Sequence, residues 1–521
     1  MPRRLLALAL ALLGSCSPDP EDKGKKGPAF PVHGALLWAR GDDCRTLDPA
    51  EIEWGEDAKI SQNVFESLVT FKDDSVEIEG RLAKSWSFSA DGKTLTFELQ
   101  EGVKFHDGSP FNADAVVYTF KRLLDPTLPE RERPKEIPYE PNFAIIADVR
   151  ADGTSRAVFT LKTPSAVILY DLTLFGAAIV SPAAVKKHGR KFAQNPVGTG
   201  PYKFFQWDPD VRVVLDRFEG YWGAKPPIPR VIVVKVASPQ AALEKLKKGE
   251  VHVVDHPTLA DVKPLQEHPA TKIDTETSLN VGFLAFNMNK PPYNDINFRR
   301  AVSLALDRKT LNSMAYYDLG EPATNVVPPA IWRGICPTPE YEFDLAKARE
   351  ALSKVKLESK RVNLIHVTVP RPYFPEPQRV AEWVKDQLGK IGLEVRLEGF
   401  ERAPFNDKYK EKDHPMVLLG WNADFPDPDN FFFPLLHGKS AASINSSFFK
   451  DPVFDDVVQK AQSELDPAKR KELYTTAYAR YREELPTIPL IHVKQIIALS
   501  RKVDYNMHPI EFRFYIASMK N

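Results

Sequence analysis

The segment VNLIHVTVPRPYFPEPQRVAEWVKDQLGKIGLEVRL, residues 362–397, contains a complete strand–helix–strand pattern. Residues 362–369 form an apolar, β-branched run of strand length, and residues 393–397 alternate between apolar and charged side chains. Between them, apolar residues recur at helical spacing. This apolar helix face comprises Val380, Trp383, Val384 and Leu388. The segment therefore predicts a β-α-β unit, and the apolar run Met416 to Leu419 is expected to continue the same sheet.

A second β-α-β pattern lies earlier in the chain. It consists of an apolar strand at 231–234, a helix at 240–248 and a further strand at 251–254. Upstream, alternating residues on both sides of Asp91-Gly92 predict a hairpin, and Asn112 is expected to begin a helix that ends before Pro126. Two α/β regions joined by extended segments predict an α/β protein with two lobes and a ligand cleft between them.

Length and charge narrow the classes of function. A chain of 521 residues is too long for one ordinary domain and predicts two or three. Lysine plus arginine and aspartate plus glutamate both number 70, so no net charge attracts nucleic acid or an anionic membrane. Recognition by charge must therefore be local, and we expect a monomer with no nucleic-acid partner.

The N-terminus has the pattern of an export signal. Basic residues at 3–4 precede a short Leu/Ala run, and the segment closes with Leu13-Gly14-Ser15-Cys16, which resembles the lipobox of bacterial lipoproteins. We expect residues 1–15 to be a signal peptide, Cys16 to be lipidated, and residues 16–31 to be a flexible tether. A plain secretory signal with a chance cysteine is the alternative.

Two further cysteines, Cys44 and Cys336, remain. Because an exported protein lies in an oxidising compartment, a disulfide between them is favoured over a metal site or a nucleophile.

The loop that follows Met416 to Leu419 combines rings, prolines and acids. In residues 420–431, GWNADFPDPDNF, Asp424 is flanked by aromatic side chains that would shield its carboxylate and let it hold a cationic group. A proline-kinked surface turn with solvated acids is the alternative interpretation. Asp427 and Asp429 are interpreted as residues that shape the loop.

A second loop, VPRPYFP at 369–375, places Arg371 between two prolines at the end of a predicted strand. An arginine held in this way is suited to a planar carboxylate, although stacking on Tyr373 or Phe374 is the alternative. The opposite charges of Arg371 and Asp424, on loops of one lobe, suit a zwitterion.

An ordered set of motifs identifies a known family. The motifs are Leu47-Asp48-Pro49, Leu82-Ala83 with Trp86, Asp91-Gly92-Lys93, Gly102 to Gly108, Pro196 to Tyr202, Phe218 to Gly223, Asn280-Val281-Gly282, Arg299-Arg300-Ala301 and the two loops above. With these motifs in this order, the chain resembles the bacterial family 5 extracytoplasmic solute-binding proteins of ABC importers over nearly all of its mature length, and most closely the dipeptide-binding branch.

The resemblance implies a bilobal periplasmic-binding-protein fold (class II, cluster C) with mixed-sheet lobes and a hinged cleft. Lobe I is expected at 32–279 plus 492–521, with an extra subdomain at about 71–195, and lobe II at 280–491. The resemblance further implies that Asp424 takes the α-amino group of a peptide and Arg371 its carboxylate. Gly420, Trp421 and Tyr373 are expected beside them.

The implied function is capture of dipeptides or short peptides for a membrane permease, by an exported protein that is lipid-anchored and faces the periplasm or the cell exterior. No cofactor is expected. Relatives that carry nickel complexes, haem, sugars or opines leave other ligands open, as does peptide sensing without import. A glycosidase-type carboxylate pair from Asp424, Asp427, Asp429 and Glu376 is disfavoured, so we expect no enzyme. His106-Asp107 and His437 are interpreted as structural residues and not as metal ligands.

Overall fold

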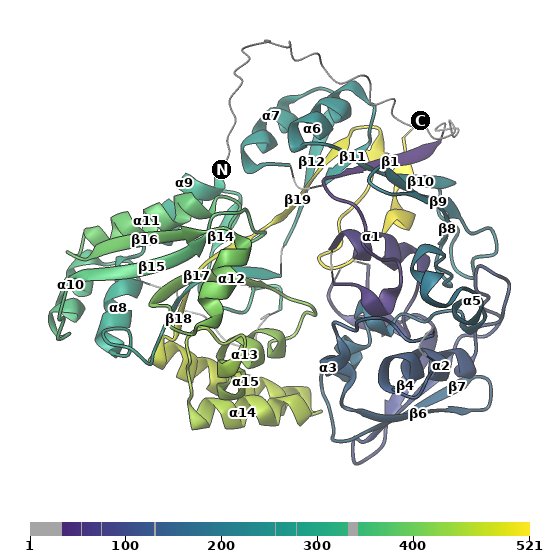
Figure 1. Cartoon of the computed structure of the whole chain (residues 1–521), viewed down its shortest axis with the longest axis horizontal. Coiled ribbons are helices and arrows are strands. Elements are labelled where there is room, and N and C mark those ends of the chain that lie inside the picture. Colours follow the sequence, from purple (N-terminus) through teal and green to yellow (C-terminus); the bar gives the residue numbers. More distant parts are fainter. Residues whose placement is uncertain are drawn as a thin grey trace, which may run out of the picture.

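The computed structural model describes residues 34–53, 55–73, 75–129, 132–255, 257–277, 279–331 and 342–520. Two large mixed sheets dominate the described chain and lie in separate lobes (Figure 1). The chain passes between the two sheets twice, between the strands that end at Glu276 and begin at Asn280, and at Lys494. The α/β architecture predicted from the sequence is therefore present.

The seven-stranded sheet of the first lobe has the order β12-β19-β11-β1-β10-β9-β8. Strand β1 lies between β10 and β11 and is parallel to both, so the predicted β-α-β unit spans an intervening N-terminal strand. Helix α6, Pro239–Lys248, is capped by Ser238 and ends at Gly249, whose φ of +74° suits glycine. The strands are β1 Ala35–Arg40, β8 Tyr202–Asp208, β9 Arg212–Arg217, β10 Arg230–Lys235, β11 Val253–Asp255, β12 Thr271–Glu276 and β19 Gln495–Ser500.

The six-stranded sheet of the second lobe has the order β14-β18-β13-β17-β15-β16. Its β15, α11 and β16 form the predicted β-α-β unit with parallel strands, and β17 continues the sheet as predicted. Strand β13 is buried throughout because helices cover both faces of the sheet. The strands are β13 Asn280–Phe286, β14 Gly320–Pro322, β15 Arg361–Val367, β16 Glu394–Phe400, β17 Met416–Asn422 and β18 Thr487–Val493. The helices are α8 Ile296–Ala305, α9 Arg308–Tyr316, α10 Leu345–Ser353, α11 Pro377–Gly389, α12 Arg402–Lys410, α13 Asp429–Leu436, α14 Pro452–Ser463 and α15 Pro467–Glu484.

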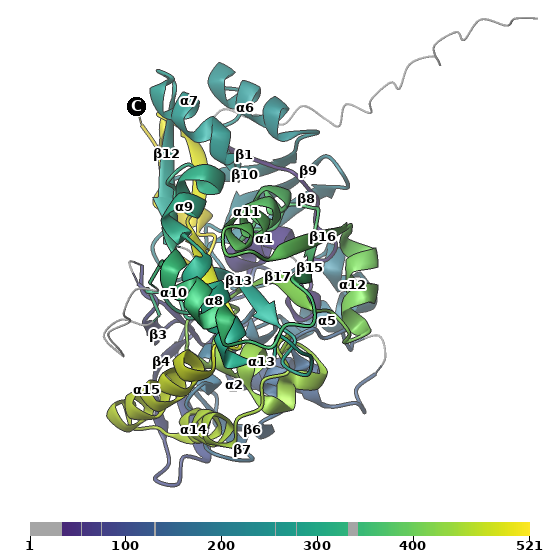
Figure 2. The same ribbon diagram turned by 90° about the vertical axis from the view of Figure 1, so that its left-hand side faces the viewer.

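A four-stranded antiparallel sheet, order β4-β5-β7-β6, forms a third unit below the first sheet (Figure 1). The predicted hairpin is confirmed as β4 and β5, and the predicted helix is α2, whose N-cap Asn112 accepts a hydrogen bond from the backbone N–H of Ala115. Figure 2 shows α14 and α15 of the second lobe at the same level as β6 and β7. The elements are β4 Ala83–Phe88, β5 Thr94–Leu99, β6 Ile146–Asp152, β7 Arg156–Leu161, α2 Ala113–Leu124, α3 Glu140–Phe143, α4 Ile168–Asp171 and α5 Pro182–His188.

The remaining elements are short. They are α1 Gly55–Val64, α7 Val262–Glu267, β2 Val69–Phe71, β3 Ile78–Gly80, β20 Val503–Asp504 and β21 Ser518–Met519. Among the helices of the described ranges, none combines the length and the apolar character that crossing a bilayer requires.

The two crossings between the lobes are bonded to each other through Asn280. Its side-chain amide donates to the carbonyl of Val493 at 3.2 Å and accepts from the N–H of Val493 at 2.9 Å. The backbone carbonyl of Asn280 also contacts Nδ1 of His492 at 2.7 Å. These buried bonds hold the crossings in a fixed register and place the lobes to face each other.

Candidate ligand-binding site

The two predicted recognition loops leave neighbouring parallel strands. Arg371 follows β15 and Asp424 follows β17, and β15 pairs with β17 in parallel register. The loops therefore leave the same edge of the second lobe's sheet, which is where ligands of α/β proteins are bound.

A pair of glycines seats the Arg371 loop on the sheet. Gly282 and Gly420 are partners across β13 and β17. A Cβ atom added to Gly282 would lie 2.4 Å from Cε1 of Phe374, and one added to Gly420 would lie 2.3 Å from Cγ of Tyr373. The missing side chains thus leave space for the two rings, which pack edge to face with centroids 5.4 Å apart. Gly420 and Tyr373, both expected near the ligand, therefore position the Arg371 loop together, because the ring of Tyr373 occupies the space left by Gly420.

Arg371 lies in a tight turn over these rings. Its backbone N–H donates to the carbonyl of Phe374 and the reverse bond is also made, at 2.9 and 3.0 Å. Its Nε lies 3.4 Å from the hydroxyl of Tyr373, and the guanidinium lies over the same ring. Among the described residues, Arg371 forms no ion pair with an acid. The structure therefore contains the stacking named as the alternative, and the guanidinium still has donors for a ligand.

The Asp424 loop is folded around the amide of Asn430. Oδ1 of Asn430 accepts hydrogen bonds from the indole N–H of Trp421 and from the backbone N–H of Asp424, both at 3.0 Å. Asp427 forms a buried bidentate pair with Arg470, at 2.6 and 2.7 Å, and also accepts from the backbone N–H of Asp429 at 2.9 Å. Of the three acids in the loop, Asp427 and Asp429 are buried and Asp424 is exposed, so the alternative of solvated acids is wrong for Asp427 and Asp429 only. The loop-shaping role predicted for Asp427 is confirmed by its bond to Asp429.

A cavity of about 940 Å³ lies between the lobes at this loop. Residues at 141–145 and 163–171 line it from the first lobe, and residues between 421 and 463 line it from the second. Asp424 and Trp421 are part of this wall. Arg371, Tyr373 and Gly420 are not among the described lining residues, so the cavity contains one of the two predicted charge clamps.

The Asp424 carboxylate faces the cavity without a cationic partner in the described chain. Its Oδ1 lies 3.4 Å from the hydroxyl of Tyr139, which belongs to the first lobe. Solvent reaches the side chain, but the surrounding protein displaces enough water to raise the pKa of Asp424 above its ordinary value, against the opposing effect of Asn430 and Tyr139. A ligand cation at this position would restore the lost solvation.

Two more aspartates line the same cavity, and both are buried. Asp171 is 4% exposed and accepts from the side-chain amide of Asn142 at 2.8 Å. Asp429 is 7% exposed and accepts from Gln462 at 3.2 Å. Burial raises the pKa of Asp429 to about 7 and raises the pKa of Asp171 well above its ordinary value, with further repulsion from Asp429, Asp427 and Asp424 acting on Asp171.

The lobes touch directly beside the cavity. Phe425, from the second lobe, is 4% exposed and belongs to the hydrophobic core of the four-stranded sheet, where it stacks on Tyr170 with centroids 5.9 Å apart. The backbone N–H of Ala166 donates to the carbonyl of Gln462 at 2.8 Å, also between lobes. One wall of the site is therefore closed by Phe425.

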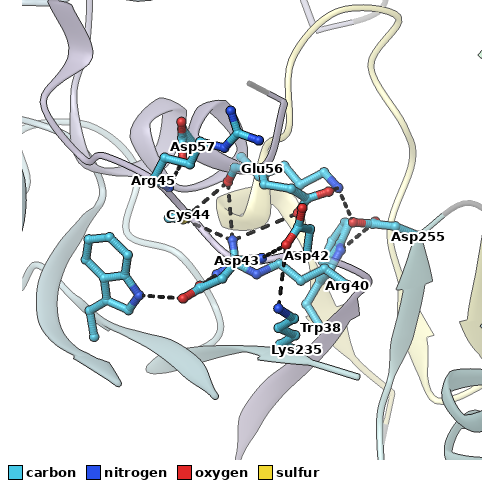
Figure 3. Close-up of polar contacts among 12 residues, drawn as sticks. Trp38, Arg40, Asp42, Asp43, Cys44, Arg45, Glu56, Asp57, Lys235 and Asp255 are labelled. Atoms are coloured by element: carbon cyan, nitrogen blue, oxygen red, sulfur yellow. Dashed lines mark hydrogen bonds and ion pairs between the residues drawn. The ribbon is translucent and has the colours of Figure 1, made fainter. Parts of the chain in front are cut away.

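Cys44 lies far from this cavity, in the polar cluster of Figure 3. Its sulfur accepts from Nη1 of Arg40 at 3.0 Å, and burial raises the pKa of the thiol to about 12, against the opposing charge of Arg40. Cys336 and Cys16 lie outside the described residues, so the Cys44–Cys336 disulfide and the lipidation of Cys16 stay predictions.

The histidines considered as metal ligands have other contacts. Nε2 of His106 lies 2.9 Å from the carbonyl of Gly200, and Nδ1 of His437 accepts from the backbone N–H of Lys439 at 3.0 Å. Within the part of the chain that the structure describes, no group of three or more histidine, cysteine or acidic side chains is arranged to hold a metal ion.

Three features of the cavity region were not predicted from the sequence. They are the presence of Asp171, the presence of Tyr139 and the contact that Phe425 makes with the other lobe. Asp171 and Tyr139 lie more than two hundred residues before the Asp424 loop and belong to the other lobe, so no local pattern connects them to it. Phe425 carried a signal, since it follows Asp424 directly and is a large apolar residue in an otherwise polar loop.

Comparison with known proteins gives a consistent result. The family described as bacterial extracellular solute-binding proteins, family 5 middle, matches residues 77–443. The dipeptide-binding protein of Escherichia coli (strain K12) is 31% identical over 446 residues, covering 82% of this chain and 83% of that protein. Heme-binding protein A of Haemophilus influenzae is 31% identical over 461 residues, covering 85% and 84%.

Among solved structures, the dipeptide binding protein from Pseudoalteromonas sp. SM9913, in complex with Met-Leu, superimposes with a TM-score of 0.78. It is 28% identical and the match covers 93% of this chain and 100% of that one. These matches, together with the two facing sheets, establish the bilobal periplasmic-binding-protein fold. The chain therefore belongs to the bacterial extracellular solute-binding proteins of family 5, which bind solutes and are not enzymes.

Proposed function

We propose that this protein is the lipid-anchored substrate-binding component of an ABC importer, which captures dipeptides or short oligopeptides between its lobes and delivers them to a membrane permease. One observation carries the proposal: the interlobe cavity presents the carboxylate of Asp424 with no cationic partner in the described chain. Peptide-binding relatives in periplasmic transport support the same ligand class and location.

The charges of the two side chains decide which end of the peptide each one binds. Asp424 binds the α-amino group of the peptide, and Arg371 binds its carboxylate after the lobes close. Trp421, Tyr373 and Gly420 shape the space between these groups. The first lobe comprises residues 32–279 plus the C-terminal segment, with its subdomain at about 71–195, and the second lobe begins at residue 280. We move the expected boundary between residues 491 and 492 to Lys494, because β18 continues the second lobe's sheet to Val493.

Closure follows from ligand contacts with both lobes. A peptide held by Asp424 and Arg371 of the second lobe, and touching the 141–171 wall of the first, favours the closed arrangement over the open one. A permease then distinguishes loaded from empty protein by shape. The N-terminal lipid keeps the protein at the membrane where the permease lies.

The proposal is tested by calorimetry with dialanine and with its N-acetylated and C-amidated forms. Wild type binds dialanine, and each blocked peptide binds at least about a hundredfold more weakly, because a buried charge left without its partner costs roughly 3 to 5 kcal/mol. Asp424→Asn and Arg371→Gln lose tight binding of dialanine, while their thermal unfolding stays close to that of wild type.

Arg379→Gln is the matched control, since Arg379 is exposed and pairs with Glu376 on α11, away from the cavity. It is expected to bind dialanine as wild type does. Undiminished dialanine affinity in both the Asp424 and the Arg371 variant would overturn the assignment of the two clamps.

A further inference from the structure

The cavity wall carries more negative charge than one peptide amino group requires. Of the described residues that line it, four are aspartates and one is a lysine. That lysine, Lys460, is exposed and forms an ion pair with Asp456 at 2.7 Å. Among the described residues, Asp171, Asp424 and Asp429 form no ion pair with a cationic side chain.

Of the two buried aspartates in the cavity wall, Asp171 and Asp429, Asp429 has a carboxylate oxygen without a hydrogen-bond donor among the described residues. It is the first residue of α13, and one of its carboxylate oxygens accepts from Gln462. The other oxygen, Oδ1, is buried and has no hydrogen-bond partner among the described residues. Arg470 is close enough to lower the pKa of Asp429, but both of its Nη atoms bond to Asp427. Buried carboxylate oxygens in folded proteins nearly always have a hydrogen-bond donor, and a donor group of a ligand in this cavity would satisfy Oδ1.

Asp171 approaches the same cavity from the opposite lobe. It is the last residue of α4, and a neutral amide, Asn142, donates to it. Its charge and that of Asp429 repel each other, since the presence of Asp429 raises the pKa of Asp171. One cation between the two carboxylates would satisfy both, and it would also link the lobes.

We propose that Asp171 and Asp429 form a second cation subsite, which takes the ammonium or guanidinium group of a lysine or arginine side chain of the bound peptide. The subsite rests on the proposed function, because Asp424 holds the α-amino group of that same peptide in the same cavity. Basic peptides are then preferred over neutral peptides of equal size.

The preference is measured by calorimetry at pH 8 with matched pairs of dipeptides. Lysine is compared with norleucine and arginine with citrulline, which have nearly the same shape without the charge, each placed before and after alanine. Wild type is expected to bind the lysyl or arginyl peptide at least about tenfold more tightly than its neutral match, in at least one of the two orders.

Asp171→Asn and Asp429→Asn remove one charge each and keep the shape of the side chain. Each variant is expected to reduce the preference to within about twofold and to leave the affinity for the norleucyl peptide unchanged, which also shows that the variant is folded. Asp456→Asn is the control, because Asp456 lines the same cavity but is exposed and paired with Lys460. It retains the full preference.

Equal affinities of the charged and neutral peptides for wild type, in both orders, would overturn the subsite and leave the proposed peptide binding intact. A preference that survives in both the Asp171 and the Asp429 variant would also overturn it. Binding of none of these peptides would instead overturn the proposed function, and the subsite with it.

Discussion

At the scale of single residues, Asp429 is one of the groups through which pH acts on the folded protein. Burial is the main cause that raises its pKa to about 7, repulsion by Asp427 adds to it, and Gln462 and Arg470 oppose it. Asp171 faces it from the first lobe and is shifted in the same direction. In the unfolded chain both carboxyls regain an ordinary pKa near 3.9.

These shifts fix the sign of the pH dependence. Between about pH 4 and pH 7 the folded protein binds more protons than the unfolded chain, so the contribution of Asp429 to stability is greatest at low pH and is lost as pH rises through 7. Asp429→Asn removes the ionisable group. We expect it to raise the melting temperature most at pH 8 and by clearly less at pH 5, where only about a third of the contribution has been lost. The gain at pH 8 is at most about 4 kcal/mol, since each pKa unit corresponds to ~1.4 kcal/mol.

Differential scanning calorimetry at both pH values measures this effect. Asp456→Asn, at an exposed and paired aspartate, is the control and should melt with wild type at both. A melting temperature of Asp429→Asn equal to that of wild type at pH 8 would contradict the prediction.

Residues were predictable from sequence where their surroundings are local. Asp424 was singled out because it follows a buried strand and stands between rings, and Arg371 because two prolines flank it, and the structure places Asp424 in the cavity wall. Asp429 was interpreted only as a loop-shaping residue, since its burial depends on Gln462 and on the lobe that contains Asp171. A single sequence carries no signal for contacts of that kind.

At the scale of elements, the glycine pair on β13 and β17 determines where the Arg371 loop lies. We predict that Gly282→Ala destabilises the protein by roughly 1 to 3 kcal/mol, because the new methyl group would overlap the ring of Phe374. The displaced ring moves the turn that holds Arg371, so dialanine affinity falls as well. Urea unfolding and calorimetry measure the two effects.

A double-mutant cycle separates overpacking from a general weakening of the strand. Because the three atoms nearest to the added Cβ all belong to the ring of Phe374, Phe374→Leu is expected to relieve part of the cost, so the two changes together cost less than their sum. Gly389→Ala, at the end of α11 with open space around it, is the control and should not destabilise. Strict additivity of the Gly282 and Phe374 changes would refute the packing argument.

Periodicity predicted the elements better than their order in the sheets. The hairpin β4–β5, helix α2 and both β-α-β units were expected, because the apolar residues of each element recur at regular spacing within one short segment. The insertion of β1 between β10 and β11 was not expected. A strand's partner depends on the assembled sheet, and β1 meets strands that lie about two hundred residues further along the chain.

At the scale of the whole molecule, two features control the relation of the lobes. Asn280 and Val493 bond the two crossings together, so the lobes move about a narrow connection. On the other side, Phe425 crosses to the first lobe and stacks on Tyr170. Because a hinge alone favours no arrangement, the burial of Phe425 in the core of the first lobe is an apolar contact that favours closure.

We therefore predict that Phe425→Ala shifts the protein toward the open arrangement. Removing a buried phenylalanine costs roughly 3 to 5 kcal/mol in a core, and at this interlobe contact the cost falls on closure more than on the fold of either lobe. Small-angle scattering should give a larger radius of gyration for the peptide-free variant than for wild type. Saturating dialanine should close the variant as it closes wild type, with a dialanine affinity at least about tenfold weaker.

Phe433→Ala is the control, because Phe433 lines the same cavity but packs on His437 within its own lobe, and it should leave the peptide-free radius unchanged. If the scattering curves of Phe425→Ala and wild type coincide without peptide, closure does not depend on this ring, and the hydrogen bond from Ala166 to Gln462 becomes the contact to remove next.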